Sequence, residues 1–389
     1  MKKYISVIIF IFITFSLHSQ EIQKKYLKGN LTEKTQTIKE ASGTDSVWLA
    51  DKSINFIKEN AKLLHDDRDF ENFTITTIYS LPKEYVNSQS EKSKKQIMIT
   101  FMNLYKLYDT SVNVDIAILT KVEQLRELIP TDEFADFLNN ELQNFNLTNS
   151  RKPLFKSLVS ALGTIGNNHS FKILYNLYET DNYKELKETV SSAMVNLIPA
   201  SMDEVISIIC SKNLLKINGF FEIIKKNDNI QQKNLSEIAE NLLNETILLL
   251  SSSPDKKELI VSLQMDCLGI LKASRWTRAS NSMLKFFNAA KNEYKTGILN
   301  DEQFSSVIEA LMIISPIEAV NPLIDLLGEY NNDVENNRKV SSNVVIAVIN
   351  TLGALGDKTA FDILLSVTYL SYPEKVLSAA QSALAGLKW

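Results

Sequence analysis

The chain has 389 residues, which is long for one ordinary compact core and indicates two domains or one extended array. Only 11 glycines and 8 prolines occur, and this scarcity disfavours many short strands joined by tight turns. A hydrophobic content of 44% excludes a disordered chain. The net charge of −4 makes the chain a poor match for nucleic acid, which requires a basic face.

The first residues have the layout of a secretory signal peptide. Lys2 and Lys3 precede an uncharged apolar run over 4–17, and Ser19 supplies a small residue at the expected cleavage point. The run is shorter than the roughly 20 residues that span a bilayer, and an uncleaved anchor is the alternative interpretation. We expect residues 1–19 to be removed, the mature chain to be secreted or periplasmic, and no later segment to span a membrane.

Helical periodicity begins soon after this leader. In the segment 46–64, apolar residues recur at steps of three and four and form one stripe, with charged residues off it. The stripe consists of Val47, Ala50, Ile54, Ile57, Ala61 and Leu64. Asp45 directly precedes it and is a plausible N-cap. The segment therefore predicts an amphipathic helix.

Two further segments test this interpretation. Residues 72–80 (NFTITTIYS) resemble a strand most closely, but the stretch is short and solitary, so we expect a helix. Residues 234–250 repeat the helical pattern through Leu235 and Ile238, and either Asn234 or Ser236 could cap that helix. Helices are thus expected throughout the mature chain.

One stretch of the sequence occurs twice in similar form. Residues 161–174 (ALGTIGNNHSFKIL) return as 351–364 (TLGALGDKTAFDIL), and the register continues without a gap from 191–197 to 381–387. The matched pairs are Leu162/Leu352, Gly163/Gly353, Gly166/Gly356, Phe171/Phe361, Ile173/Ile363, Leu174/Leu364, Ser192/Ser382, Ala193/Ala383 and Leu197/Leu387. We expect the glycines to end a first helix, where the second helix must approach closely.

Weaker copies lie between the two strong ones. They start at Leu268 and Leu311, which gives spacings of 32 to 43 residues between successive copies. Such spacings fit a stack of two-helix units. A single helix pair cannot bury both of its apolar sides, so neighbouring pairs must stack.

The repeated pattern resembles that of the HEAT-repeat family, especially the short repeats of phycobilisome lyases. The resemblance covers 155–197 and 262–389 and becomes faint elsewhere. It implies an all-α fold, an α-α superhelix (α-solenoid) of stacked antiparallel helix pairs. We expect degenerate repeats over 20–150 and a HEAT-like array over 151–389. The family has no shared catalytic residues, so none is expected here.

Few residues suggest chemistry. The cluster His65–Asp69 (HDDRD) contains imidazole and carboxylates, but Arg68 lies within it and a solvated turn is expected instead of a metal site. His169 has Thr359 as its counterpart in the second copy, which argues against a ligand role. Cys210 and Cys267 lie in apolar surroundings and are expected to be buried thiols, with a disulfide as the alternative. No cofactor or metal is expected.

The segment 272–280 (KASRWTRAS) contains the candidate partner-binding residues Arg275, Trp276 and Arg278. Arg and Trp are enriched at interaction hot spots, and Arg binds carboxylates well. The segment also looks about three residues longer than the matching turns. The alternative is that Trp276 packs into the stack while both arginines are ordinary surface charges.

These features predict an exported, non-enzymatic α-solenoid that binds a protein or peptide partner as a scaffold or adaptor in the cell envelope. Two other function classes stay open: an enzyme of the HEAT-like lyase type, and a nucleic-acid-binding solenoid. The export signal and the acidic net charge oppose the last of these.

Overall fold

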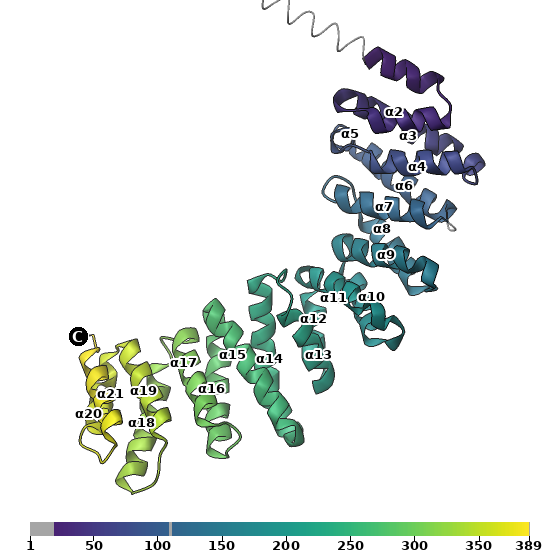
Figure 1. The fold of residues 1–389 in the computed structure, drawn as a ribbon. Coiled ribbons are helices and arrows are strands. Elements are labelled where there is room, and N and C mark those ends of the chain that lie inside the picture. The colour runs from purple at the N-terminus through teal and green to yellow at the C-terminus, as the bar shows by residue number, and fades with distance from the viewer. Residues whose placement is uncertain (1–18, 109–110, 389) are drawn as a thin grey trace, which may run out of the picture. The chain divides into compact units, whose positions relative to one another are not determined.

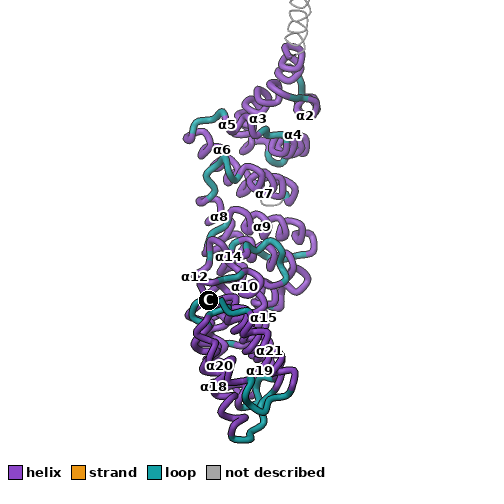
Figure 2. The backbone as a smooth tube through the Cα atoms, turned by 90° about the vertical axis from the view of Figure 1, so that its left-hand side faces the viewer, coloured by secondary structure: helices purple, strands orange, loops and turns teal. Residues whose placement is uncertain are grey.

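The computed structural model describes residues 19–108 and 111–388, and these ranges are built from helices joined by short loops (Figure 2). They contain no β-strand; Asp357 and Lys388 form an isolated bridge. The all-α prediction is thus confirmed, and residues 72–80 are helical apart from Ser80. The predicted signal peptide, 1–19, lies outside the described residues apart from Ser19. None of the described helices is long and apolar enough to cross a bilayer.

The chain divides into two compact units between Ser201 and Met202. In the first unit a helical segment over 19–28 is followed by α2 Leu31–Glu40, α3 Gly43–Leu64, α4 Arg68–Tyr79, α5 Lys83–Asn87, α6 Glu91–Leu107, α7 Val112–Leu125, α8 Asp132–Gln143, α9 Lys152–Ile165, α10 Asn168–Glu179 and α11 Lys187–Asn196. Short 3-10 turns are η1 Asn149–Arg151, η2 Asp181–Leu186 and η3 Ile198–Ala200.

The first unit is a stack of two rows of helices. One row contains α2, α4, α7, α9 and α11, each in contact with the next, and the other contains α3, α6, α8 and α10 (Figure 1). The same arrangement continues across residue 150, the position at which we expected degenerate repeats to pass into the HEAT-like array of the same stack. Helices before and after that position therefore belong to one stack, α7 packing directly on α9.

The helices of the second unit are α12 Met202–Ile209, α13 Leu214–Lys225, α14 Gln232–Ser252, α15 Lys257–Ser274, α16 Ser280–Lys295, α17 Asp301–Ile314, α18 Val320–Glu335, α19 Ser342–Leu355, α20 Phe361–Val367 and α21 Glu374–Ala385. Its 3-10 turns are η4 Pro254–Lys256, η5 Thr277–Ala279 and η6 Lys358–Ala360. From α14 onward the helices form the pairs α14/α15, α16/α17, α18/α19 and α20/α21. One helix of each pair belongs to a continuous row, which consists of α15, α17, α19 and α21. This unit too is a stack of helix pairs (Figure 1).

The repeated motif occupies equivalent places in the two units. Gly163 on α9 faces Ala193 on α11, where an added Cβ would lie 2.6 Å from the Ala193 Cα. Gly353 on α19 faces Ala383 on α21, where an added Cβ would lie 2.8 Å from the Ala383 Cβ. The matched Gly and Ala positions thus form the same contact twice. The glycine is required because two helices of the same row approach too closely for a side chain.

This contact corrects our expectation about the partner helix. We expected the glycine to allow close approach of the second helix of its own repeat. Instead it allows close approach of the first helix of the next repeat, which is α11 for Gly163 and α21 for Gly353. The helix that follows the motif is also not the main neighbour of the motif helix, since α19 packs mainly along α21 and α17, the adjacent helices of its own row. The motif sequence therefore encodes stacking between repeats rather than closure of one hairpin.

The second glycine of the motif has a different task in each copy. Gly356 ends α19 with φ +68°, the left-handed conformation that glycine adopts without strain. Gly166 ends α9 with φ −73°, and a Cβ there would lie 2.3 Å from the carbonyl oxygen of Leu162. Glycine is therefore needed at both positions for different reasons: backbone conformation at Gly356 and lack of space at Gly166.

Our predictions of helix caps were wrong at both tested positions. Helix α3 begins at Gly43, before Asp45, and α14 begins at Gln232, before Asn234 and Ser236. Asn234 and Ser236 are buried in the stack instead. Cap preference is a local signal of about 1 kcal/mol, whereas contact with neighbouring helices decides how far each helix extends.

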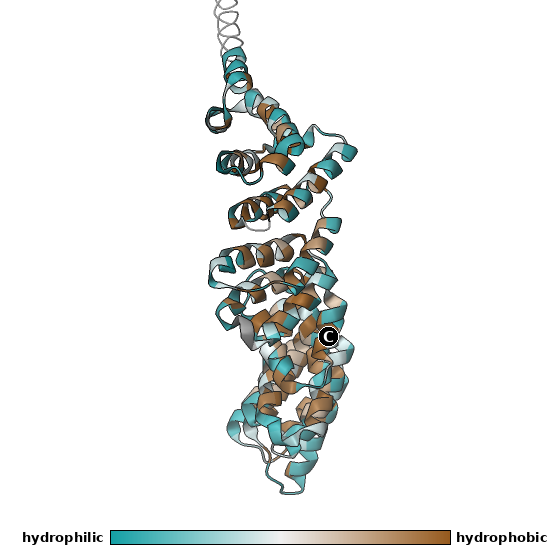
Figure 3. Cartoon of the chain, turned by 90° about the vertical axis from the view of Figure 1, so that its right-hand side faces the viewer, coloured by the Kyte–Doolittle hydropathy of each residue, from teal (hydrophilic) through white to brown (hydrophobic). Residues whose placement is uncertain are grey.

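Apolar side chains fill the space between the rows. The largest fully buried residues are phenylalanines spread along both units, including Phe70, Phe155 and Phe286. Hydrophobic residues run along the helices and hydrophilic residues cover many of the turns (Figure 3). Each unit thus has a core extended along its stack, as expected for an array of repeats.

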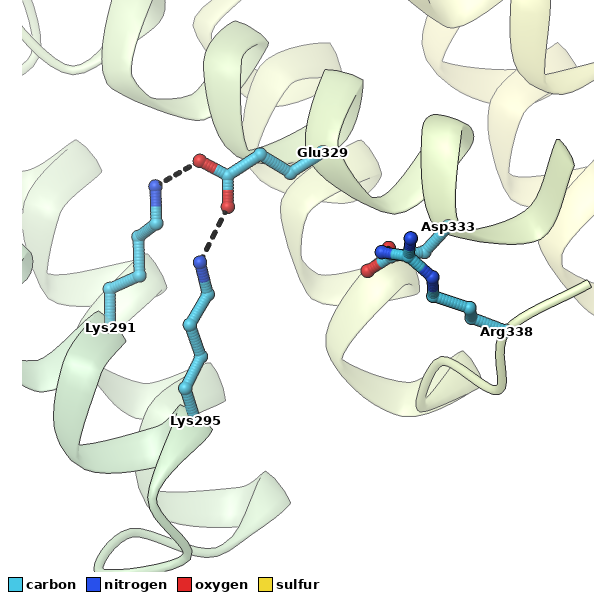
Figure 4. Close-up of polar contacts among 5 residues, drawn as sticks. All are labelled: Lys291, Lys295, Glu329, Asp333 and Arg338. Atoms are coloured by element: carbon cyan, nitrogen blue, oxygen red, sulfur yellow. Dashed lines mark hydrogen bonds and ion pairs between the residues drawn. The ribbon is translucent and has the colours of Figure 1, made fainter. Parts of the chain in front are cut away.

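Ion pairs also join neighbouring repeats, and in each of these the lysine precedes its acidic partner in sequence. Glu329 on α18 accepts from Lys291 and Lys295 on α16, while Asp333 pairs locally with Arg338 at 3.0 Å (Figure 4). Equivalent pairs are Lys95–Glu133, Lys152–Glu185, Lys225–Asp266 and Lys272–Glu309. Such exposed or half-exposed pairs each add little stability.

Candidate functional site

The turn 275–279 between α15 and α16 contains the three residues that the sequence analysis selected. Arg275 ends α15 in the left-handed conformation, with φ 48° and ψ 49°. Its backbone N–H donates to the Lys272 carbonyl, and the N–H of Trp276 donates to the Leu271 carbonyl, both at 3.1 Å. These bonds cap the open carbonyls of α15 and fix the path of the turn.

Trp276 is anchored to the preceding helix pair. Its Nε1 donates a hydrogen bond to Glu240 Oε2 on α14 at 2.9 Å, and the other oxygen of Glu240 accepts from the Ser282 hydroxyl at 3.1 Å. Ser282 in turn accepts from the Asn244 amide at 3.0 Å. One carboxylate therefore ties the turn and the start of α16 to α14.

Both arginines project into solvent beside this anchored indole. Arg275 and Arg278 are exposed, Trp276 is half-buried, and the Arg278 guanidinium carbon lies 6.0 Å from the centre of the Trp276 ring. The distance is at the outer limit of a cation–π contact. The turn thus holds two exposed guanidinium groups beside an indole that Glu240 fixes by a hydrogen bond.

The neighbouring turn 315–319 adds an apolar element. Ser280 at the start of α16 lies 2.5 Å from the Ser315 hydroxyl and donates to Glu318 at 3.1 Å, which places the two turns side by side. Between these contacts Ile317 is 85% exposed. We define the Arg-Trp edge as Arg275, Trp276, Arg278 and Ile317.

The structure corrects the argument from turn length. The turn 275–279 is as long as the corresponding turns 315–319 and 356–360, and only the turn between α9 and α10 is three residues shorter. Composition, rather than length, therefore distinguishes this turn. The structure also shows Trp276 half-buried with its Nε1 bonded to Glu240, which lies between the two alternatives considered from the sequence.

Sequence reasoning did not find Glu240 or Ile317. Glu240 lies in the middle of α14, 36 residues before Trp276. This separation is within the range of the repeat spacing, and the sequence offered no other sign that the two residues are in contact. Ile317 belongs to a weak copy of the motif, where its counterparts in the strong copies are Asn168 and Lys358, so its position in the motif gave no signal for an apolar surface residue. Both become recognisable only when the turns are placed side by side.

The other candidate residues lie apart from this edge. Asp67 caps α4 by accepting from the Phe70 N–H at 2.8 Å, so His65–Asp69 forms a turn and helix start, as predicted. His169 is exposed in the first turn of α10. The part of the chain that the structure describes holds no group of three or more metal-binding side chains.

The two cysteines differ, against our expectation that both are buried. Cys267 is fully buried, and burial raises the pKa of its thiol well above the ordinary value. Cys210 is exposed at the end of α12, and both thiols are free. The apolar stretch before Cys210 belongs to a short helix that ends at Ile209, which leaves the thiol outside the packed face.

Glu293 is one of the acidic residues that are buried in the stack. It is 6% exposed on α16, and Gln264 Nε2 donates to its Oε1 at 3.3 Å, while its Oε2 has no hydrogen-bond partner among the described residues. Burial raises the pKa of this carboxyl, and the bond from Gln264 opposes the shift. Its burial and its bond to Gln264 place this side chain in the interior of the stack.

Comparisons of the chain with protein-family models, with curated proteins and with solved structures gave no match. The resemblance to HEAT repeats therefore rests on the residues of the motif.

Proposed function

We propose that this chain is an exported, non-enzymatic α-solenoid that binds a protein or peptide partner in the cell envelope. The observation that supports the proposal is the Arg-Trp edge, in which two exposed guanidinium groups flank an indole fixed by Glu240. Arg binds carboxylates through two parallel hydrogen bonds, and an anchored neighbour lowers the entropy lost on binding. The partner is expected to present an acidic segment with an apolar residue that covers Ile317.

The binding mechanism needs no bond chemistry. Carboxylates of the partner pair with Arg275 and Arg278, and an apolar side chain packs on the open side of Trp276 and on Ile317. Exposed aromatic and aliphatic surface next to arginine is typical of interaction hot spots. Contacts along the helices of the stack would add area around this centre.

A photo-crosslinking amino acid at the exposed Thr277 tests the proposal in the envelope fraction of the native cell. We expect a discrete adduct at Thr277 that falls at least tenfold in the double variant Arg275→Ala/Arg278→Ala. The matched control is Arg338→Ala, which removes an exposed arginine of the same unit outside the edge. Equal adduct yield in the double variant and in the control would refute a role for the Arg-Trp edge.

A further inference from the structure

A second site lies in the first unit, in a groove between α3 and α6. The groove encloses a cavity of about 350 Å³, near the lower end of the range for small-molecule sites. Its lining comes from one face of each helix: Lys58, Ala61 and Lys62 on α3, and Gln96, Thr100, Asn103, Leu104, Lys106 and Leu107 on α6. These helices are neighbours in one row and make few direct contacts, which leaves the groove open.

The charge of the groove is entirely positive. Lys58, Lys62 and Lys106 line it, and no acidic side chain does. Among the described residues none of the three forms an ion pair; the Lys106 ammonium lies 5.0 Å from the ring centre of Phe137. By contrast, a cavity of about 380 Å³ beside α15 is lined by both Lys257 and Glu258.

This arrangement is unfavourable when the groove is empty. Lys58 and Lys62 are four residues apart on α3, and like charges at that spacing destabilise a helix by about 0.2–0.5 kcal/mol. A third cation on the opposite wall adds to the repulsion. A bound anion would offset this repulsion, because an opposite charge close to each lysine favours its charged form.

The polar and apolar residues of the groove are separated. The amides of Gln96 and Asn103 are exposed and make no hydrogen bond within the described chain, so their N–H groups can donate to an anion. Ala61 and Leu104 are buried and Leu107 is half-buried, which provides an apolar floor. A free inorganic anion would use the rim alone, whereas an anion with an apolar body would also cover the floor.

We propose that the groove between α3 and α6 binds a small amphipathic anion, a carboxylate on an aliphatic body, with the head group at Lys58, Lys62 and Lys106. The aliphatic body lies on Ala61, Leu104 and Leu107. This site is in the first unit and is independent of the Arg-Trp edge, which lies in the second. Failure of either proposal leaves the other intact.

Lysine acetylation of the full-length protein, read residue by residue by mass spectrometry, tests the proposal with octanoate as the probe. We expect octanoate to slow the acetylation of Lys58, Lys62 and Lys106 at least threefold, with Lys92 on the same helix α6 as the unprotected internal control. Acetate at the same concentration supplies the charge without the body. Octyltrimethylammonium supplies the body without the negative charge. Neither should protect the three lysines.

A variant keeps the test independent of reagent access. Lys58→Gln/Lys62→Gln should weaken octanoate binding at least fivefold in equilibrium dialysis, while Lys92→Gln should bind like the unchanged protein. Absence of protection up to the solubility limit of octanoate would overturn the proposal. So would equal protection by octyltrimethylammonium, or equal loss of affinity in Lys92→Gln.

Discussion

Replacing Gly163 with alanine probes the contact that repeats in both units. An added Cβ would lie 2.6 Å from the Ala193 Cα and 2.7 Å from its Cβ. Carbon atoms in van der Waals contact are about 3.5–4.0 Å apart, so α9 and α11 must separate by roughly 1 Å. Ala193 cannot yield by changing rotamer, because the nearest atom belongs to its backbone.

The expected loss of stability follows from two opposing contributions. Overpacking of a well-filled core costs about 1–3 kcal/mol. Replacing glycine by alanine within a helix returns about 0.5–1 kcal/mol. Overpacking is larger, and Gly163→Ala should therefore destabilise the contact between α9 and α11 by about 0.5–2 kcal/mol. A control is Gly269→Ala on α15, where an added Cβ meets nothing within 4 Å, and which should gain about 0.5–1 kcal/mol.

Hydrogen exchange read by mass spectrometry measures both effects locally, which suits an array that need not unfold in one step. Every 1.4 kcal/mol is a tenfold change in an equilibrium constant, so amides of α9 and α11 should exchange about 2- to 30-fold faster in Gly163→Ala. Amides of α15 should exchange more slowly in Gly269→Ala. If Gly163→Ala slowed exchange in α9 and α11 as much as Gly269→Ala slows it in α15, the close approach of α9 and α11 would be refuted.

The remaining predictions concern three polar side chains. Asn139 is 1% exposed, and neither of its amide atoms has a hydrogen-bond partner within residues 19–108 and 111–388, so Asn139→Leu should raise stability by about 1–3 kcal/mol in urea denaturation. Burial raises the pKa of Glu293 in the folded protein. The contribution of this carboxyl to the free energy of unfolding is therefore fully present below its pKa in the unfolded chain, and it is lost as the pH rises through its pKa in the folded protein. Glu293→Gln, which keeps a partner for Gln264, should therefore raise Tm at pH 8 more than at pH 4. Glu240→Ala frees the indole of Trp276, and chymotrypsin should cut after Trp276 several-fold faster, whereas Glu240→Gln should keep most of the protection.

The repeat is the part of the fold that could be predicted from sequence. Leu, Gly and Ala recur at fixed offsets because one contact geometry is used again, and the structure places Gly163/Ala193 and Gly353/Ala383 in that geometry. Helix starts were predicted poorly at Asp45 and Asn234. A cap changes the energy of one end only, whereas the neighbouring helices determine where packing stops.

The candidate site was predictable only in part. Arg275, Trp276 and Arg278 lie close together in sequence, and their residue types alone select them as a candidate site. Ile317 and Glu240 reach the same edge from other repeats, through contacts that no single turn encodes. The groove of Lys58, Lys62 and Lys106 has the same origin, since its walls lie more than 30 residues apart.

The repeated contact also limits how far a perturbation can spread. In a stack, each helix pair touches its neighbours alone, so stability is close to a sum of repeat and interface contributions. Gly163→Ala should accelerate exchange in α9 and α11 and leave α19 and α21 unchanged, while Gly353→Ala should do the reverse. The two substitutions are thus replicates of one experiment in different units. A response of α19 to Gly163→Ala would mean that the two units unfold together, and the nearest-neighbour description would then fail.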